Sequence, residues 1–100
     1  MKQPDEVLVE RIYQAYPKHI AKKNALRAIR NACKDKSTIE AAGEMPTENF
    51  LLIAASDYCE YCESVKKDKK YIPLPATWFN GARWEDEDFV EWRQKQNCYQ

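Results

Sequence analysis

Three long segments of this chain repeat their apolar residues at the spacing of an α-helix, and no segment shows the strict alternation that is typical of a half-buried strand. The clearest helix is predicted from about Glu48 to Lys67. Thr47 precedes it as a good N-cap residue. Its apolar stripe steps by four and three residues through Leu51, Ala55, Tyr58, Cys62 and Val65. The periodicity therefore predicts an all-α fold.

Two further long helices are predicted before that one. The first runs from about Asp5 to Tyr16, with acidic residues in its first turn. Pro17 disfavours helical geometry at Tyr16 and can itself open a helix, so the second helix is expected to follow directly, from about Lys18 to Lys36. Its apolar positions are rich in alanine, which permits close helix packing; they are Ala21, Ala25, Ala28, Ile29, Ala32 and Cys33.

The segments around these helices contain turn residues and prolines. Residues 35–46 lose the helical period, so we expect a connector there, with at most a short turn at residues 39–42. Residues 71–75 are expected to be extended, because Pro73 and Pro75 fix φ and remove two hydrogen-bond donors. Pro75 then opens a short helix that ends at Phe79, and Asn80-Gly81 supplies a left-handed stop.

One hundred residues with 44% hydrophobic side chains and only two glycines suffice for one globular domain, here residues 1–100. The acidic run 85–88 predicts the first turn of a last helix that carries Phe89, Val90 and Trp92. The expected fold is a compact bundle of three main helices plus a short helix and a C-terminal helix, with an extended Pro-rich segment.

The charges are unevenly distributed along the chain, although 16 Lys and Arg balance 16 Asp and Glu. Residues 17–36 hold seven basic residues against Asp35, whereas residues 37–64 hold six acidic residues and no basic one. In the predicted second helix, basic residues follow each other by four, three and four positions and share one face. These residues are Lys23, Arg27, Arg30 and Lys34.

Two interpretations of this basic face remain open. It is either a solvated face offset by the acidic third helix, which is the commoner outcome, or a surface that contacts phosphates. The candidate binding residues are those of the basic helix and of two later basic positions, namely Lys22, Lys23, Arg27, Arg30, Lys34, Lys69, Lys70 and Arg83. Tyr71, Trp78 and Trp84 are able to stack on bases, but such residues more often form the core.

The sequence contains no recognisable catalytic or cofactor motif. Cys59 and Cys62 form a lone C-x-x-C, which lacks a second pair for zinc and lies inside a helical pattern rather than at a helix start. His19 has no acid or nucleophile near it in sequence. We therefore expect no catalytic residues, no metal, no cofactor and free thiols. Without a signal-peptide pattern or a long apolar run, the expected location is cytoplasmic, with no membrane partner.

Two separated motifs resemble a known helical module. The first is Tyr16-Pro17 followed by Lys22-Lys23, Ala25 and Ala28. The second, more specific motif runs from Tyr71 to Asp86 and includes Tyr71, Pro73, Pro75, Trp78, Asn80 and Trp84. Together they are similar to the C-terminal module of phage and prophage replication proteins of the replication-initiator or primosome-organiser type. That family commonly has a histidine between the two prolines, where this chain has Leu74.

The resemblance implies a setting in phage DNA replication. The leading expectation is a non-enzymatic accessory module that binds DNA or a replication protein through the basic second helix. The alternative is a small phage-encoded protein that binds and modulates a host protein, such as a replication factor or a defence nuclease. In that case an acidic surface would imitate a nucleic-acid backbone, formed by Glu40, Glu44, Asp57, Glu60 and Glu63.

Overall fold

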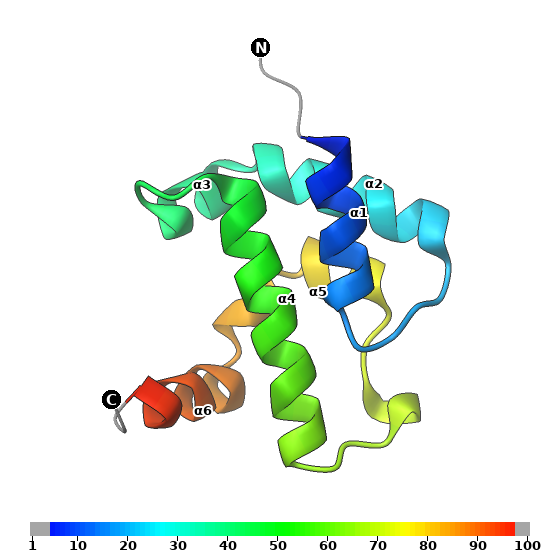
Figure 1. The fold of residues 1–100 in the computed structure, drawn as a ribbon, viewed down its shortest axis with the longest axis vertical. Helices are drawn as coiled ribbons and strands as arrows, with labels where there is room; N and C mark the ends of the chain where they lie inside the picture. Colours follow the sequence, from blue (N-terminus) through cyan, green and yellow to red (C-terminus); the bar gives the residue numbers. More distant parts are fainter. Residues whose placement is uncertain (1–4, 98–100) are drawn as a thin grey trace.

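The computed structural model describes residues 5–97, and Figure 1 shows their arrangement. Within this range the chain forms α-helices and two short 3-10 helices but no strand, so the predicted all-α class is confirmed. The α-helices are α1 (Glu6–Ala15), α2 (Lys22–Lys34), α3 (Lys36–Ala42), α4 (Thr47–Ser64), α5 (Pro75–Asn80) and α6 (Glu87–Asn97). The 3-10 helices are η1 (Lys69–Tyr71) and η2 (Arg83–Glu85).

The first helix forms where the sequence predicts it. The Asp5 side chain caps α1 by accepting a hydrogen bond from the Val7 amide at 2.9 Å. Tyr16 is extended, as expected of a residue that precedes a proline. Val9, Ile12 and Tyr13 are buried, so the helical period correctly identifies the face of α1 that enters the core.

The second helix is shorter than predicted at both ends. It begins at Lys22 rather than directly after Pro17, because residues 17–21 form a loop that ends in a left-handed Ala21 with φ 54°. It ends at Lys34, where Asp35 is extended and separates α2 from α3. The expected alanine-rich face is buried from Ala25 to Cys33, whereas Ala21 is exposed and lies outside the helix.

The predicted connector between the second and third long helices is wrong over its first half. Residues 36–42 form α3, which buries Thr38 and ends at Gly43. Gly43 adopts φ 65°, a conformation that favours glycine, so the turn signal lies at the end of a helix instead of inside a loop.

The long central helix also differs from the prediction at both ends. Thr47 is the first residue of α4 and not its cap, because its hydroxyl donates instead to the Cys33 carbonyl at 3.1 Å. The helix ends at Ser64, three residues early. Lys66 takes a left-handed φ of 54°, and the Lys67 amide donates back to the Cys62 carbonyl at 2.9 Å, which is a Schellman termination.

The Pro-rich segment leads from η1 into α5. Tyr71 is the last residue of η1 and is not extended, while Ile72 and Leu74 do have extended backbones. Pro75 is the first residue of α5, as predicted. The left-handed residue after α5 is Ala82, with φ 49°, and not Asn80 or Gly81.

The helices meet around one aromatic core. In Figure 1, α1 lies beside the upper part of the long α4, α2 crosses behind them, and α5 lies under α2. Trp78 of α5 is fully buried, and its ring contacts four buried rings outside α5, one from the residue that follows α1 and the others from α4, η2 and α6. Those rings belong to Tyr16, Tyr58, Trp84 and Phe89. Trp78 and Trp84 are therefore core residues, and their exposed stacking on bases is ruled out in this fold.

Candidate functional site

Three basic side chains of α2 lie on one exposed face and form what we call the cation row: Lys23, Arg27 and Lys34. None of them makes a salt bridge or hydrogen bond to another residue of the described range 5–97. Lys34 acts only at longer range, where its charge helps to lower the pKa of Glu6. The row thus presents three uncompensated positive charges along one helix.

The two other predicted basic residues of α2 are held by α1. Arg30 donates to both carboxylate oxygens of Glu6, at distances between 2.7 and 3.1 Å, and the Lys22 ammonium lies 3.1 Å from Glu10. The hydrogen bond from Arg30 lowers the pKa of Glu6. The pKa of Glu10 is lowered by hydrogen bonds from Gln14 and then Lys22. Arg30 and Lys22 therefore fasten α2 to α1, and they are less available to an outside partner than the cation row.

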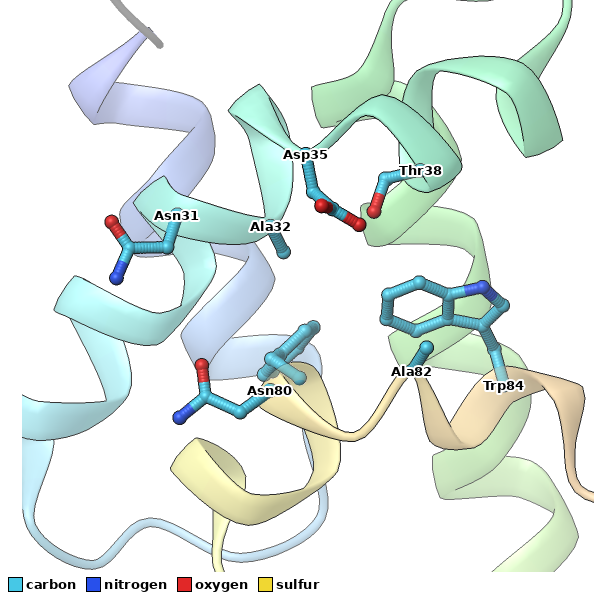
Figure 2. A pocket seen from close by; sticks show the side chains of 8 residues that line it. Asn31, Ala32, Asp35, Thr38, Asn80, Ala82 and Trp84 are labelled. Carbon is cyan, nitrogen blue, oxygen red and sulfur yellow. The ribbon is translucent and has the colours of Figure 1, made fainter.

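A groove lined by both amide and apolar side chains follows the cation row on the side that faces α5. Its first cavity, of about 300 Å³, is lined by Asn24, Arg27, Ala28, Asn31, Ala76 and Asn80. A second cavity of about 180 Å³ adjoins it and shares Asn31 and Asn80 (Figure 2). Asp35, Thr38, Phe79 and Trp84 are among the residues that line this second cavity. We call the two cavities together the α2–α5 groove.

Sequence reasoning missed most of this groove. Asn80 is predicted only as a motif residue that caps a turn, and Asn24 and Asn31 are absent from the predicted site. The helical spacing does contain a signal, because positions 24 and 31 are seven residues apart and flank the basic positions on the same helix. What the spacing does not contain is the position of α5, which forms the opposite wall.

The second predicted basic cluster is separate from the cation row. Lys69 and Lys70 belong to η1, which lies far below α2 in Figure 1. The Lys70 ammonium stands 5.2 Å from the ring centroid of Tyr71, and this tyrosine is 67% exposed. Arg83 is exposed on η2, beyond the end of α5. The structure thus distributes the predicted binding residues over more than one surface.

The two motifs that carry the family resemblance meet in space. The Tyr16 hydroxyl donates to the Pro73 carbonyl at 2.6 Å. The Lys18 ammonium donates to the carbonyls of Lys69 and Ile72 at 2.9 and 3.0 Å. Pro17 lies between these two donors, so its motif attaches the Pro-rich segment to the end of α1. We call this set of three hydrogen bonds the Tyr16–Lys18 clamp.

The cysteines and the histidine occupy structural positions. Cys59 and Cys62 both lie within α4, and burial raises the pKa of each thiol. Burial raises the pKa of Cys33 to about 11, so this thiol is unreactive at neutral pH. Cys98 is outside the described residues. His19 is exposed, with its Nε2 3.0 Å from the Gln14 carbonyl. Among residues 5–97, no group of three or more His, Cys, Asp and Glu side chains is arranged to hold a metal ion.

The acidic residues of the alternative interpretation are spread over the region from α3 to the end of α4. Glu40, Glu44, Glu60 and Glu63 are exposed. Asp57 is half-buried and pairs with Arg93 of α6 at 3.1 Å. One of the five acidic residues is therefore paired within the chain, just as Arg30 and Lys22 are paired on the basic helix.

None of the helices in the described part of the chain is both long and apolar enough to cross a membrane. Comparison of the chain with protein-family models, with curated proteins and with solved structures finds no significant match.

Proposed function

We propose that this domain binds nucleic acid through the cation row of α2. The observation that carries the proposal is that Lys23, Arg27 and Lys34 are exposed on one helix face without an ion-pair partner, whereas neighbouring Arg30 and Lys22 are paired with α1. Like charges on one face repel each other, and a polyanion relieves that repulsion while it releases its own counterions.

The dimensions of the row fit this role. Eleven residues separate Lys23 from Lys34, which corresponds to about 16 Å along a helix that rises 1.5 Å per residue. Phosphates of one strand follow each other at a few ångströms, so several of them lie within reach of the row. The buried apolar face of α2 holds the helix in place beneath the row, so that the cations are presented by a supported helix.

The proposed setting is phage DNA replication, in which the domain is a non-enzymatic accessory module. This setting rests on the resemblance of the two motifs to the C-terminal module of phage replication proteins. The Tyr16–Pro73 hydrogen bond of the clamp supports it, since it joins one residue of each motif and gives the two motifs a structural reason to occur together. The proposed site of action is the cytoplasm, where such a replication complex works.

The test is a salt titration of binding to short fluorescent DNA oligonucleotides, single-stranded and duplex, measured by anisotropy. The variant K23Q/R27Q/K34Q removes the row while it leaves the salt bridges to α1 intact. Each lost phosphate contact should reduce the slope of log K against log salt by about 0.7 to 0.9. We therefore expect much weaker binding and a slope smaller by about two units or more.

The matched control is K69Q/K70Q/K95Q, which removes the same charge from η1 and α6. It should bind DNA nearly as well as the parent protein if the row is responsible. Equal weakening by both triple variants would show that overall charge, and not the row, drives binding. Absent or salt-independent DNA binding at low ionic strength would overturn the proposed function. Unchanged circular dichroism and melting temperature are required of both variants.

A further inference from the structure

We propose that the α2–α5 groove takes an unstacked base of a single-stranded nucleic acid and selects bases with an exocyclic amino group, adenine, cytosine and guanine, over thymine. The inference rests on the proposed function, because the cation row has to hold the backbone beside the groove. It goes further by naming the form of nucleic acid and the bases that the site prefers.

The position of the groove relative to the cation row is the first support. Arg27 belongs to both, since it lies in the row and lines the first cavity together with Asn24. A strand whose phosphates follow the row would therefore have its bases directed toward α5. Contacts to phosphates position a nucleic acid and contacts to base edges select its sequence, and α2 presents residues of both kinds on adjacent stripes.

The amide side chains of the groove are the second support. Asn31 extends from α2 and Asn80 from α5, and Figure 2 shows their amide groups on the same side of the view. None of the hydrogen bonds found within residues 5–97 involves either amide or that of Asn24. Each amide offers a donor and an acceptor, which is the pattern that pairs with the edge of adenine.

The carboxylate of Asp35 is the third support and the source of selectivity. It lies at the other end of the groove, next to the Thr38 side chain and above the Trp84 ring (Figure 2). A carboxylate repels phosphate, so this end does not suit the strand's backbone. One oxygen of Asp35 accepts a hydrogen bond from the Ser37 hydroxyl, and the carboxylate can also accept from the amino group of adenine, cytosine or guanine. Thymine has no amino group and offers only its ring N–H, between two carbonyl oxygens that a carboxylate repels. Phe79 and Trp84 line this end of the groove but are both buried in the core, so they add little surface to it.

The shape of the groove favours a single strand. Its walls come from α2 and α5 and, at the Asp35 end, also from α3 and η2, and a base has to enter between them. In a duplex the bases stay stacked and show only their edges at the bottom of a groove, whereas single strands allow bases to be turned outward and bound along their edges. The proposed ligand is therefore single-stranded, with cations on the backbone and amides on the base.

The experiment measures binding of the intact protein to thymidine oligonucleotides that carry adenine or cytosine at interior positions, against all-thymidine strands of equal length. A good pair of base-edge hydrogen bonds gives on the order of fivefold to a hundredfold discrimination, and we expect a preference toward the lower end of that range for the strands with adenine and cytosine. D35N should reduce or reverse the preference, because an amide at this position can donate to a thymine carbonyl. N31A and N80A should reduce it as well.

The control N49A removes an exposed amide of α4 and should change nothing. If every strand binds equally, and D35N and N31A behave like the parent protein, the groove does not bind bases, although the proposed function still holds. If duplex DNA binds more tightly than any single strand, the single-strand proposal is wrong. If no oligonucleotide binds at all, the proposed function fails and this inference fails with it. Melting temperatures of all variants separate these outcomes from loss of folding.

Discussion

At the scale of single residues, the hydroxyl of Tyr16 is the contact whose removal is most informative. The Tyr16 ring is fully buried, and its hydroxyl donates to the Pro73 carbonyl at 2.6 Å. Tyr16→Phe keeps the ring and leaves that carbonyl without its partner, so we expect a loss of about 1 to 2 kcal/mol in the free energy of unfolding. Chemical denaturation followed by tryptophan fluorescence measures the change.

Tyr71→Phe is the control for that substitution. Tyr71 belongs to the second motif, which contains Pro73, but it is 67% exposed, and no hydrogen bond to its hydroxyl is found among the described residues. It should leave stability unchanged within a few tenths of a kcal/mol, as is usual for surface positions. Equal effects of the two substitutions would contradict the role assigned to the Tyr16–Lys18 clamp.

Sequence periodicity correctly identifies most buried residues but few of their polar contacts. Ile12, Ala25 and Leu51 are each fully buried, as their helical stripes predict. The pairing of Arg30 with Glu6 spans 24 residues and depends on how α2 crosses α1, which no local pattern encodes. For this reason the sequence identifies the basic residues of α2 without showing which of them remain free.

At the scale of elements, the helices themselves are predictable and their ends are not. The long apolar stripes correctly indicate α1, α2 and α4. The start of α2 is mispredicted because Lys18 is hydrogen-bonded to the carbonyls of Lys69 and Ile72, more than fifty residues away. The helix α3 is missed because only one of its seven residues, Thr38, is buried, so it carries almost no hydrophobic period.

At three of these helix ends, a residue other than glycine adopts the left-handed conformation. These residues give a second prediction. Ala21 and Lys66 are exposed and have φ of 54°. A residue other than glycine in the left-handed conformation costs roughly 1 to 2 kcal/mol. Replacement by glycine removes this strain, but the greater chain entropy of glycine in the unfolded state cancels about half of the gain. Ala21→Gly and Lys66→Gly should each therefore stabilise the domain by about 0.5 to 1 kcal/mol, measured by denaturation.

Ala41→Gly provides the opposite case, because Ala41 is exposed within α3. Glycine inside a helix is less favourable than alanine by about 1 kcal/mol, so this variant should lose stability. A loss of stability in all three glycine variants would show that the left-handed turns are not under strain.

At the scale of the whole molecule, the thiol and hydroxyl groups buried in the core make the free energy of unfolding fall at alkaline pH. Burial raises the pKa of Cys33 from 9.0 to about 11, and burial followed by the charge of Tyr58 raises that of Tyr16 far above its ordinary value. Both groups are neutral when protonated, and the unfolded chain gives up these protons at lower pH than the folded one. Stability is therefore fully present below pH 9 and is lost progressively as the pH rises toward 11 and beyond.

Melting temperatures recorded by circular dichroism from pH 7 to 11 check this expectation. The melting temperature should hold near neutral pH and fall steadily above pH 9. Cys33→Ala should make the decline between pH 9 and 11 shallower, since it removes one of the buried thiols that titrate there in the unfolded chain. A melting temperature independent of pH up to 11 would mean that these side chains are more accessible to water than their burial indicates.

The Tyr16–Lys18 clamp has a consequence for how relatives of this chain are to be recognised. Two hydrogen-bond donors near the end of α1 hold carbonyls that come 51 to 57 residues later, and carbonyls are present whatever the side chains there. In the Pro-rich segment we therefore expect the prolines to be kept, because they hold the backbone in shape. At the end of α1 we expect the Tyr16 hydroxyl and the Lys18 ammonium to be kept. A search that requires tyrosine, proline and lysine together upstream of a proline pair, with the intervening length left free, should find homologues that overall identity misses.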